Sequence, residues 1–248
     1  LMSFKPLSEM YVIPTPWFPK PPFQISNYIE AWIKYPFLTY FKNTILVVVA
    51  ATMGNVMSSS ITAFGFARIR FPGRDFLFVI LISTMMLPYQ VKIIPLFQMY
   101  KTIGWLNSLW PLIVPAFFAS ASPFFVFLMR QFFLSIPEEL ADAARIDGCG
   151  FVNIYLRIFL PLTKPAMVTV ALFSFMDNWN DFFMPLIYIN SNQFKTLSLG
   201  LAGMTGQYVS DWHIIMAASV ITVLPCVIIF LLAQRHFVEG IALSGIKG

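Results

Sequence analysis

The chain has 248 residues, of which 58% are hydrophobic and 11% are charged, whereas a soluble domain carries roughly 25% charged residues. Together with a mean hydropathy of +0.74, this composition excludes a cytosolic globular enzyme, a disordered chain and a small disulfide-stapled domain. The net charge of +5 does not indicate a nucleic-acid-binding protein, because the basic residues are scattered between apolar runs instead of clustered.

The N-terminal segment, residues 1–41, is predicted to be irregular and extracytoplasmic, with one short helix over residues 27–33. Six prolines fall between residues 6 and 22, a density that breaks regular structure. The chain opens on Leu1 and Met2 without the charged region of a signal peptide. Because an outside N-terminus without a signal peptide ordinarily follows a membrane span, we expect a further helix upstream of residue 1.

Apolar stretches long enough to cross a membrane recur along the rest of the chain. A hydrocarbon core about 30 Å thick requires about 20 apolar residues in a helix. Five stretches meet this requirement, at residues 43–67, 76–100, 102–129, 165–190 and 212–234. The sequence therefore predicts an all-α, polytopic transmembrane bundle over residues 42–235, followed by a tail over residues 236–248.

The arginines predict the orientation of these spans. If successive loops alternate between the two sides, all seven arginines fall on one side: Arg68, Arg70, Arg74, Arg130, Arg145, Arg157 and Arg235. The positive-inside rule makes that side cytoplasmic. The N-terminus is then outside, and the tail is inside.

The longest cytoplasmic connection, residues 131–164, contains a polar segment too short to span a membrane. Ser135 and Glu138 have the spacing of a capping box. They predict a helix over residues 137–148 that stops at Gly148, a suitable residue to end a helix. This spacing alone is equally compatible with an amphipathic surface helix whose charges are only solvated.

The same loop offers two further features. Ala141 and Ala144 would give the helix a small-residue face that the backbone of another protein could approach closely. A second short helix is predicted over residues 151–160, ending at Pro161 before the chain returns to the membrane.

One motif in this loop resembles a known signature. Asp142-Ala143-Ala144 is followed after three residues by Gly148, and nine residues later by Ile158 and the pair Leu160-Pro161. This spacing resembles the EAA motif of permease subunits of bacterial ABC importers, with Asp142 where the family usually has Glu. Residues 179–186 and the tail resemble the carbohydrate-importer branch, and more specifically the maltose-type permease that lacks the large extracytoplasmic insertion.

The resemblance implies that helix 137–148 couples this chain to separate ATPase subunits during alternating access. The residues implied in coupling are Glu138, Glu139, Asp142, Ala143, Ala144, Asp147, Gly148, Ile158, Leu160 and Pro161. The implied partners are two ATP-binding subunits, which would hold ATP and Mg²⁺, a second homologous permease forming a heterodimer, and an extracytoplasmic solute-binding protein. The substrate would be a carbohydrate, the location the bacterial inner membrane, and the chain itself would carry no cofactor.

Two carboxylates lie within the fourth predicted span. Asp177 and Asp181 are four residues apart, on one helical face, and Asn178, Trp179 and Asn180 lie between them. A charge at mid-membrane costs about 2.5–3.5 kcal/mol, so both should face a wet cavity, an interface or a partner. Two interpretations stay open: a translocation path that binds sugar hydroxyls, or packing between the two permease halves.

Three glycines precede the last span. The spacing of Gly200, Gly203 and Gly206 is compatible with close helix packing, but the polar residues around them favour a flexible loop. In the resembling permeases this loop contacts the solute-binding protein, which implies docking roles for Leu199, Gly203, Gly206 and Tyr208.

The sequence supports two other classes of function less well. An ion-coupled secondary transporter would use Asp177 and Asp181 as its ion site, but no inverted repeat is visible. A membrane enzyme lacks a catalytic motif, and no nucleotide-binding loop G-x-x-x-x-G-K-[ST] is present. Cys149 and Cys226 lack the spacing of a metal site, so this chain is not expected to be an enzyme.

Overall fold

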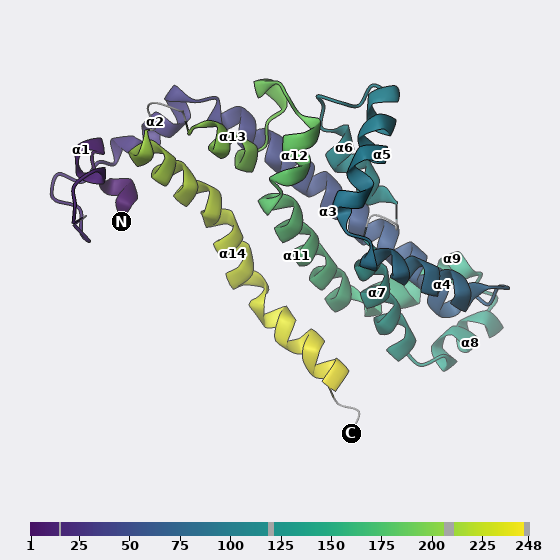
Figure 1. The fold of residues 1–248 in the computed structure, drawn as a ribbon. Helices are drawn as coiled ribbons and strands as arrows, with labels where there is room; N and C mark the ends of the chain where they lie inside the picture. The colour runs from purple at the N-terminus through teal and green to yellow at the C-terminus, as the bar shows by residue number, and fades with distance from the viewer. Residues whose placement is uncertain (15, 119–121, 206–210, 246–248) are drawn as a thin grey trace.

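The computed structural model describes residues 1–14, 16–118, 122–205 and 211–245, with side chains as far as Leu232. Every regular element within these ranges is a helix, and no strand occurs among them. Figure 1 shows an open arrangement along α3 (Phe37–Arg68), with α8 (Glu139–Ile146) near its C-terminal end and α13 (Leu197–Gly203) near its N-terminal end. The prediction of an all-α fold is confirmed.

Two helices are long, unbroken and apolar enough to span a membrane. These are α3 (Phe37–Arg68) and α14 (Trp212–Gly245). At 1.5 Å per residue, the 32 residues of α3 extend about 48 Å, more than the hydrocarbon thickness of about 30 Å. The spans predicted at residues 43–67 and 212–234 are therefore confirmed as helices.

The span predicted at residues 76–100 is bent. Helix α4 (Arg74–Ser83) passes through η2 (Thr84–Met86) to α5 (Tyr89–Thr102), with a bend of 99°. The break falls at Pro88, which has no N–H for a helical hydrogen bond and forces the preceding residue into extended backbone.

The span predicted at residues 102–129 is broken into shorter helices. After α5 the chain turns at Gly104 and Asn107, whose φ angles are 74° and 57°. It then forms α6 (Trp110–Ile113), η3 (Val114–Phe117) and, beyond residues 119–121, α7 (Pro123–Ser135). Prolines stand in the first turn of each of these three helices, where the missing N–H is tolerated, and so they restart helices instead of continuing one.

The span predicted at residues 165–190 is also interrupted. Helix α11 (Lys164–Asn180) ends before Asp181, which has extended backbone, and a separate helix α12 (Phe183–Tyr188) follows. Beyond it lie η6 (Asn192–Phe194) and α13 (Leu197–Gly203). In place of five continuous helices, the described residues hold two unbroken candidate spans, two bent pairs and the shorter α7.

The N-terminal segment contains η1 (Met2–Phe4), α1 (Leu7–Met10) and α2 (Ser26–Lys34). Helix α2 confirms the predicted short helix. The Asn27 amide donates to the carbonyls of Ser3 and Lys5 at 2.9 and 3.0 Å, which fixes η1 against α2.

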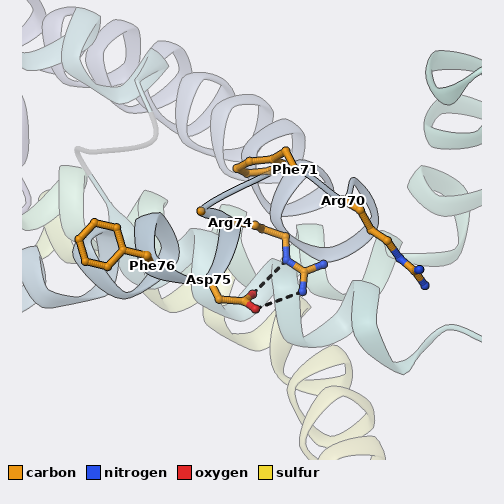
Figure 2. Close-up of a pocket in the computed structure, with 6 residues that line it drawn as sticks. Arg70, Phe71, Arg74, Asp75 and Phe76 are labelled. Carbon is orange, nitrogen blue, oxygen red and sulfur yellow. Dashed lines mark hydrogen bonds and ion pairs between the residues drawn. The ribbon is translucent and has the colours of Figure 1, made fainter.

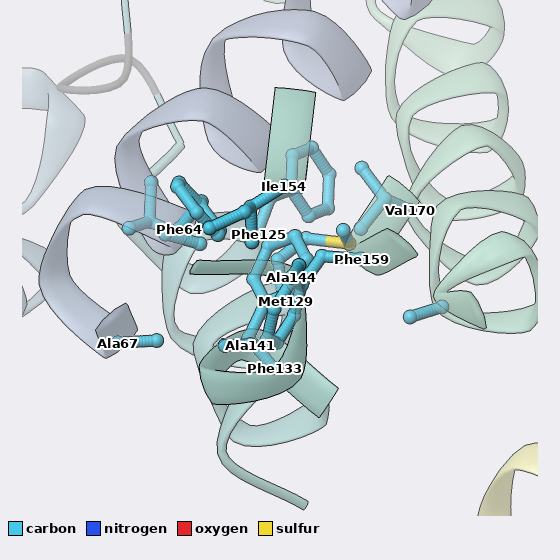
Figure 3. Close-up of a cluster of buried hydrophobic side chains, with 13 residues drawn as sticks. Phe64, Ala67, Phe125, Met129, Phe133, Ala141, Ala144, Ile154, Phe159 and Val170 are labelled. Carbon is cyan, nitrogen blue, oxygen red and sulfur yellow. The ribbon is translucent and has the colours of Figure 1, made fainter. Parts of the chain in front are cut away.

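Two clusters of buried side chains hold the ends of α3. At the α8 end, the phenylalanines and alanines of α3, α7, α8 and η5 (Tyr155–Phe159) pack together (Figure 3). At the α13 end, side chains of α2, α3, α11, α13 and the first turns of α14 form a second cluster. Helix α3 therefore belongs to both cores.

Candidate functional site

The helix expected to couple to a partner forms as α8 (Glu139–Ile146). It ends in a Schellman motif, in which the N–H of Gly148 donates to Arg145 O at 3.0 Å and the N–H of Cys149 donates to Ala144 O at 2.9 Å. Gly148 has a φ of 80°, a conformation that costs other residues steric energy. The prediction that Gly148 ends this helix is confirmed.

The predicted capping box does not form. Ser135 is the last residue of α7, and its hydroxyl donates to Phe132 O at 2.8 Å. The residue that precedes α8 is Glu138, which makes no side-chain capping bond. Ile136 is extended, as expected before Pro137, and this separates Ser135 from the first turn of α8.

The small-residue face of α8 is used inside the chain. Ala141 and Ala144 are 1% and 7% exposed and lie in the cluster with Phe133 and Phe159 (Figure 3). The prediction that this face meets another protein is therefore wrong. Alanine allows the short helix to lie close against its own bundle.

The opposite face of α8, called here the exposed face, mixes apolar and acidic side chains. Leu140 is 44% exposed and Ile146 is 86% exposed. The other members are also exposed: Glu139, Asp142, Ala143 and Asp147. Asp142 pairs with Arg145 one turn away, and Glu138 lies 3.8 Å from Arg70.

The second short helix of the loop forms as α9 (Phe151–Ile154), the π-helical turn η5 (Tyr155–Phe159) and α10 (Leu160–Leu162). A bend of 76° then leads into α11. Pro161 lies within the last turn and does not end the helix before it, contrary to prediction. Since Pro161 cannot donate to Arg157 O, the wider π turn accommodates it.

The motif residues of this second helix differ in burial. Ile158 and Leu160 are half-buried, and Pro161 is exposed. Ile158 packs against the cluster at the α8 end.

A basic turn between α3 and α4 lies at the same end as α8. It encloses a hollow of about 360 Å³ lined by Arg70, Phe71, Gly73 and the first residues of α4. Figure 2 shows the Arg74 guanidinium directed at Asp75, with Nε 3.0 Å and Nη2 3.4 Å from its two carboxylate oxygens. Arg130 also approaches Asp75, at 3.9 Å.

A cavity of about 870 Å³ is bounded by α5, α6, η3, α11 and the start of α12. Its polar lining includes Asn55, Tyr89, Lys92, Asp177, Asn178 and Asp181. Three of the five predicted path residues therefore share one cavity wall. Trp179 and Asn180 do not.

Asp177 and Asp181 do not share a helical face, contrary to prediction. Asp181 follows the end of α11, and its Oδ1 accepts hydrogen bonds from the N–H groups of Phe183 and Met184 at 3.1 and 3.2 Å. It caps α12. An acidic residue just before a helix favours such a cap. The sequence reading missed it because Asp181 lies within a long apolar stretch that predicts one continuous helix.

Trp179 joins two helices of the same chain. It is 1% exposed, its Nε1 donates to Thr222 O at 3.0 Å, and its ring stacks on Phe175 with centroids 5.3 Å apart. Trp179 therefore packs between α11 and α14 of one chain, which differs from the predicted packing between two permease halves. Asn180 donates only to Met176 O of its own helix, at 2.8 Å.

The expected flexible loop is in part a helix, α13. Gly200 lies against Tyr40 of α3, and a Cβ atom at this position would overlap the Tyr40 ring. Close helix packing, the alternative interpretation, is correct for Gly200. Leu199 is buried and Gly203 is exposed, whereas Gly206 and Tyr208 lie outside the described residues.

Sequence reasoning missed two polar contacts between distant segments. Lys34 pairs with Asp211, and the Tyr35 hydroxyl donates to the same carboxylate at 3.1 Å; the hydrogen bond from Lys34 lowers the pKa of Asp211. The Tyr89 and Tyr188 hydroxyls lie 2.8 Å apart beside the cavity. Neither pair has a spacing that a sequence could reveal.

Chemically, the site combines a protruding helix with a polar-walled cavity. Among the described residues, no group of three or more His, Cys, Asp or Glu is arranged to hold a metal ion. The side chains present can form hydrogen bonds and ion pairs with a solute or a partner.

Comparison with known proteins identifies relatives along most of the chain. A family model described as "Binding-protein-dependent transport system inner membrane component" matches residues 54–242. The probable ABC transporter permease protein YurM of Bacillus subtilis is 34% identical over 95% of this chain and 76% of its own length. The arabinooligosaccharides transport system permease protein AraQ of Halalkalibacterium halodurans is 36% identical over 85% and 74%.

A solved structure has the same fold. A chain of a bacterial ABC transporter involved in the import of the acidic polysaccharide alginate superposes with a TM-score of 0.84. The match covers 95% of this chain and 87% of that one, at 22% sequence identity.

Proposed function

The chain belongs to the family of binding-protein-dependent transport system inner membrane components, the permease subunits of ABC transporters, and we propose that it moves a sugar or oligosaccharide into the cytoplasm. As a permease it is a transport subunit and not itself an enzyme. The main support for the proposal is the burial pattern of α8. Its inner face is packed in the bundle, and its exposed face is accessible to a partner.

The partner that fits the exposed face of α8 is an ATP-binding subunit with an apolar groove edged by basic residues. Burying a Leu or Ile side chain contributes about 1.5–3 kcal/mol, so Leu140 and Ile146 can anchor the contact. The carboxylates of Glu139, Asp142 and Asp147 would select a positive rim. Two such subunits would bind ATP and Mg²⁺.

The α8 end is the cytoplasmic end in this proposal, so the C-terminus is cytoplasmic as well. Six arginines support it, because they lie at that end on α3, the α3–α4 turn, the first turn of α4, α7, α8 or η5: Arg68, Arg70, Arg74, Arg130, Arg145 and Arg157. Such an excess of arginine marks the cytoplasmic side. Lys34 and Lys195 lie at the α13 end.

The cavity beside α5 and α11 is the proposed solute path. Carboxylate, amide and hydroxyl groups such as Asp177, Asn178 and Tyr89 can hydrogen-bond to sugar hydroxyls. A second, homologous permease would complete the path as the other half of a heterodimer. An extracytoplasmic solute-binding protein would dock near Gly203, with Leu199 supporting α13 from inside.

The relatives agree with a carbohydrate substrate. AraQ is named for arabinooligosaccharides, and a further relative, 31% identical, is named as a diacetylchitobiose uptake permease of Streptomyces coelicolor. The coupling role of α8 can be tested by co-purification.

The test is to purify the protein in mild detergent from its host and to measure the ATP-binding subunits that co-purify. Ile146→Lys should lower the amount recovered at least about tenfold, since it removes an apolar anchor and adds a like charge beside a basic rim. Ile33→Lys on α2, where the isoleucine is 79% exposed, is the matched control at the opposite end and should change nothing.

A second pair of variants tests the acidic requirement. Asp142→Glu should co-purify the ATP-binding subunits normally, because it keeps the carboxylate. Asp142→Lys should recover less. Equal recovery with Asp142→Lys, or with Ile146→Lys, would contradict docking through the exposed face of α8.

A further inference from the structure

Arg68, the last residue of α3, connects three elements at the α8 end. Its Nη2 donates to the carbonyls of Phe133 and Ile136, at the C-terminus of α7 and in the link to α8. The last carbonyls of a helix lack intrahelical partners, and a cation is favoured there. The guanidinium also lies over the Phe159 ring of η5, 4.8 Å from its centroid, within the range of a cation–π contact.

Phenylalanine rings surround this contact, and two alanines of α8 pack in the same cluster (Figure 3). The Phe64 ring of α3 lies 5.8 Å from Phe133 and 5.4 Å from Phe159. Ala141 and Ala144 of α8 are buried in the same cluster. The end of α3, the segment at Ile136 between α7 and α8 (here called the link) and α8 therefore pack together, and Arg68 supplies the hydrogen bonds that join α3 to the link.

The other end of α3 is tied to α13. The Thr44 hydroxyl accepts from the Leu197 N–H at 2.8 Å, and the Asn43 amide donates to the carbonyls of Gln193 and Lys195, both at 2.9 Å. Gly200 contacts the Tyr40 ring. One unbroken helix thus holds α8 at one end and α13 at the other.

We propose that α3 transmits motion between α8 and α13, and that Arg68 is the positioning residue that makes α8 move with α3. The inference rests on the proposed function, in which α8 meets an ATP-binding subunit and α13 lies beside the solute-binding protein. Without the hydrogen bonds from Arg68, the extended link at Ile136 can rotate, and α8 can move independently of α3.

Arg70 provides the contrast. Its side chain is 88% exposed, and its ion pair with Glu138 is long at 3.8 Å. Exposed ion pairs of this kind contribute little. Substituting Arg70 removes the same charge from the same end of the molecule, so Arg70→Gln is the matched control for Arg68→Gln.

The experiment uses the complete transporter, purified with its ATP-binding subunits and reconstituted in lipid. The solute-binding protein from the same host is added with the solute it carries on purification. ATP hydrolysis is measured with and without it, and the co-purifying ATP-binding subunits are quantified. This stimulation requires a signal that crosses the membrane, whereas basal hydrolysis and co-purification do not.

Arg68→Gln should keep co-purification and basal hydrolysis within about twofold of wild type. Its stimulation should fall at least about tenfold, the factor for losing one of the two charge-assisted hydrogen bonds of Arg68. Arg68→Lys should retain part of the stimulation, because the ammonium can donate to the same carbonyls but lacks the planar fork. Arg70→Gln should behave as wild type.

Normal stimulation of Arg68→Gln would overturn the inference, as would equal losses in Arg68→Gln and Arg70→Gln. Loss of the ATP-binding subunits from Arg68→Lys would also overturn it, since Arg68 would then only shape the docking surface. Absence of ATP-binding subunits from the wild-type preparation would instead contradict the proposed function.

Discussion

Replacing Gly148 should weaken docking of the ATP-binding subunits through backbone conformation alone. A Cβ atom at this position would meet no heavy atom within 4 Å, but the φ of 80° is left-handed. An L-residue other than Gly, Asn or Asp pays roughly 1–2 kcal/mol there. Gly148→Ala therefore destabilises the Schellman end of α8 by that amount, a factor of roughly 5–30 in population.

The assay is a titration of purified ATP-binding subunits onto the permease in detergent. If docking requires the intact end of α8, the apparent dissociation constant of Gly148→Ala rises by up to the same factor. Gly148→Asn should stay near wild type, because Asn tolerates this conformation.

Gly150 offers a matched control two residues away. A Cβ atom there would likewise meet no heavy atom within 4 Å, but the backbone is extended, with φ −77° and ψ 167°. Gly150→Ala should therefore bind normally. Equal affinities for Gly148→Ala and wild type, or equal losses in the two alanine variants, would show that docking does not depend on the left-handed backbone at Gly148.

Two further predictions concern the α13 end. Gly200→Ala should destabilise the protein by about 1–3 kcal/mol in thermal unfolding, because the new methyl overlaps the Tyr40 ring. Gly65→Ala should not, because a Cβ atom there has no heavy atom within 4 Å. Equal melting temperatures for Gly200→Ala and Gly65→Ala would contradict the packing of Gly200 against Tyr40. The hydrogen bond from Lys34 lowers the pKa of the Asp211 carboxyl in the folded state. The ionised carboxylate therefore contributes its full stabilisation of the fold above the unfolded-state pKa of about 4. This contribution disappears as the pH falls through the lower folded-state pKa. The melting-temperature difference between wild type and Asp211→Asn should shrink over that interval, and a difference that grows with acid would contradict the pairing.

Hydropathy predicted which segments are apolar but not where their helices break. Residues 37–68 contain no proline and form one helix, as expected. The stretch at residues 102–129 is also apolar but contains three prolines and Gly104. Hydropathy reports the transfer of side chains into lipid, whereas helix continuity depends on backbone N–H groups and φ angles, so the two signals must be read together.

The candidate site was predicted in part for a similar reason. The position of Gly148 needs only local chemistry, and it was predicted correctly. The inward face of α8 depends on the fold-back of the link onto α3, which Arg68 holds across more than 60 residues of sequence. No local pattern carries that information, and Ala141 and Ala144 were therefore assigned to the wrong surface.

Uptake by the reconstituted transporter shows whether ATP drives transport through this chain. Vesicles holding the permease, its ATP-binding subunits and internal ATP would receive the loaded solute-binding protein, and solute accumulation would be measured. We expect uptake that requires ATP, resists a protonophore and is lost in Ile146→Lys. Uptake that proceeds without ATP under a proton or sodium gradient, and depends on Asp177 and Asp181, would contradict it.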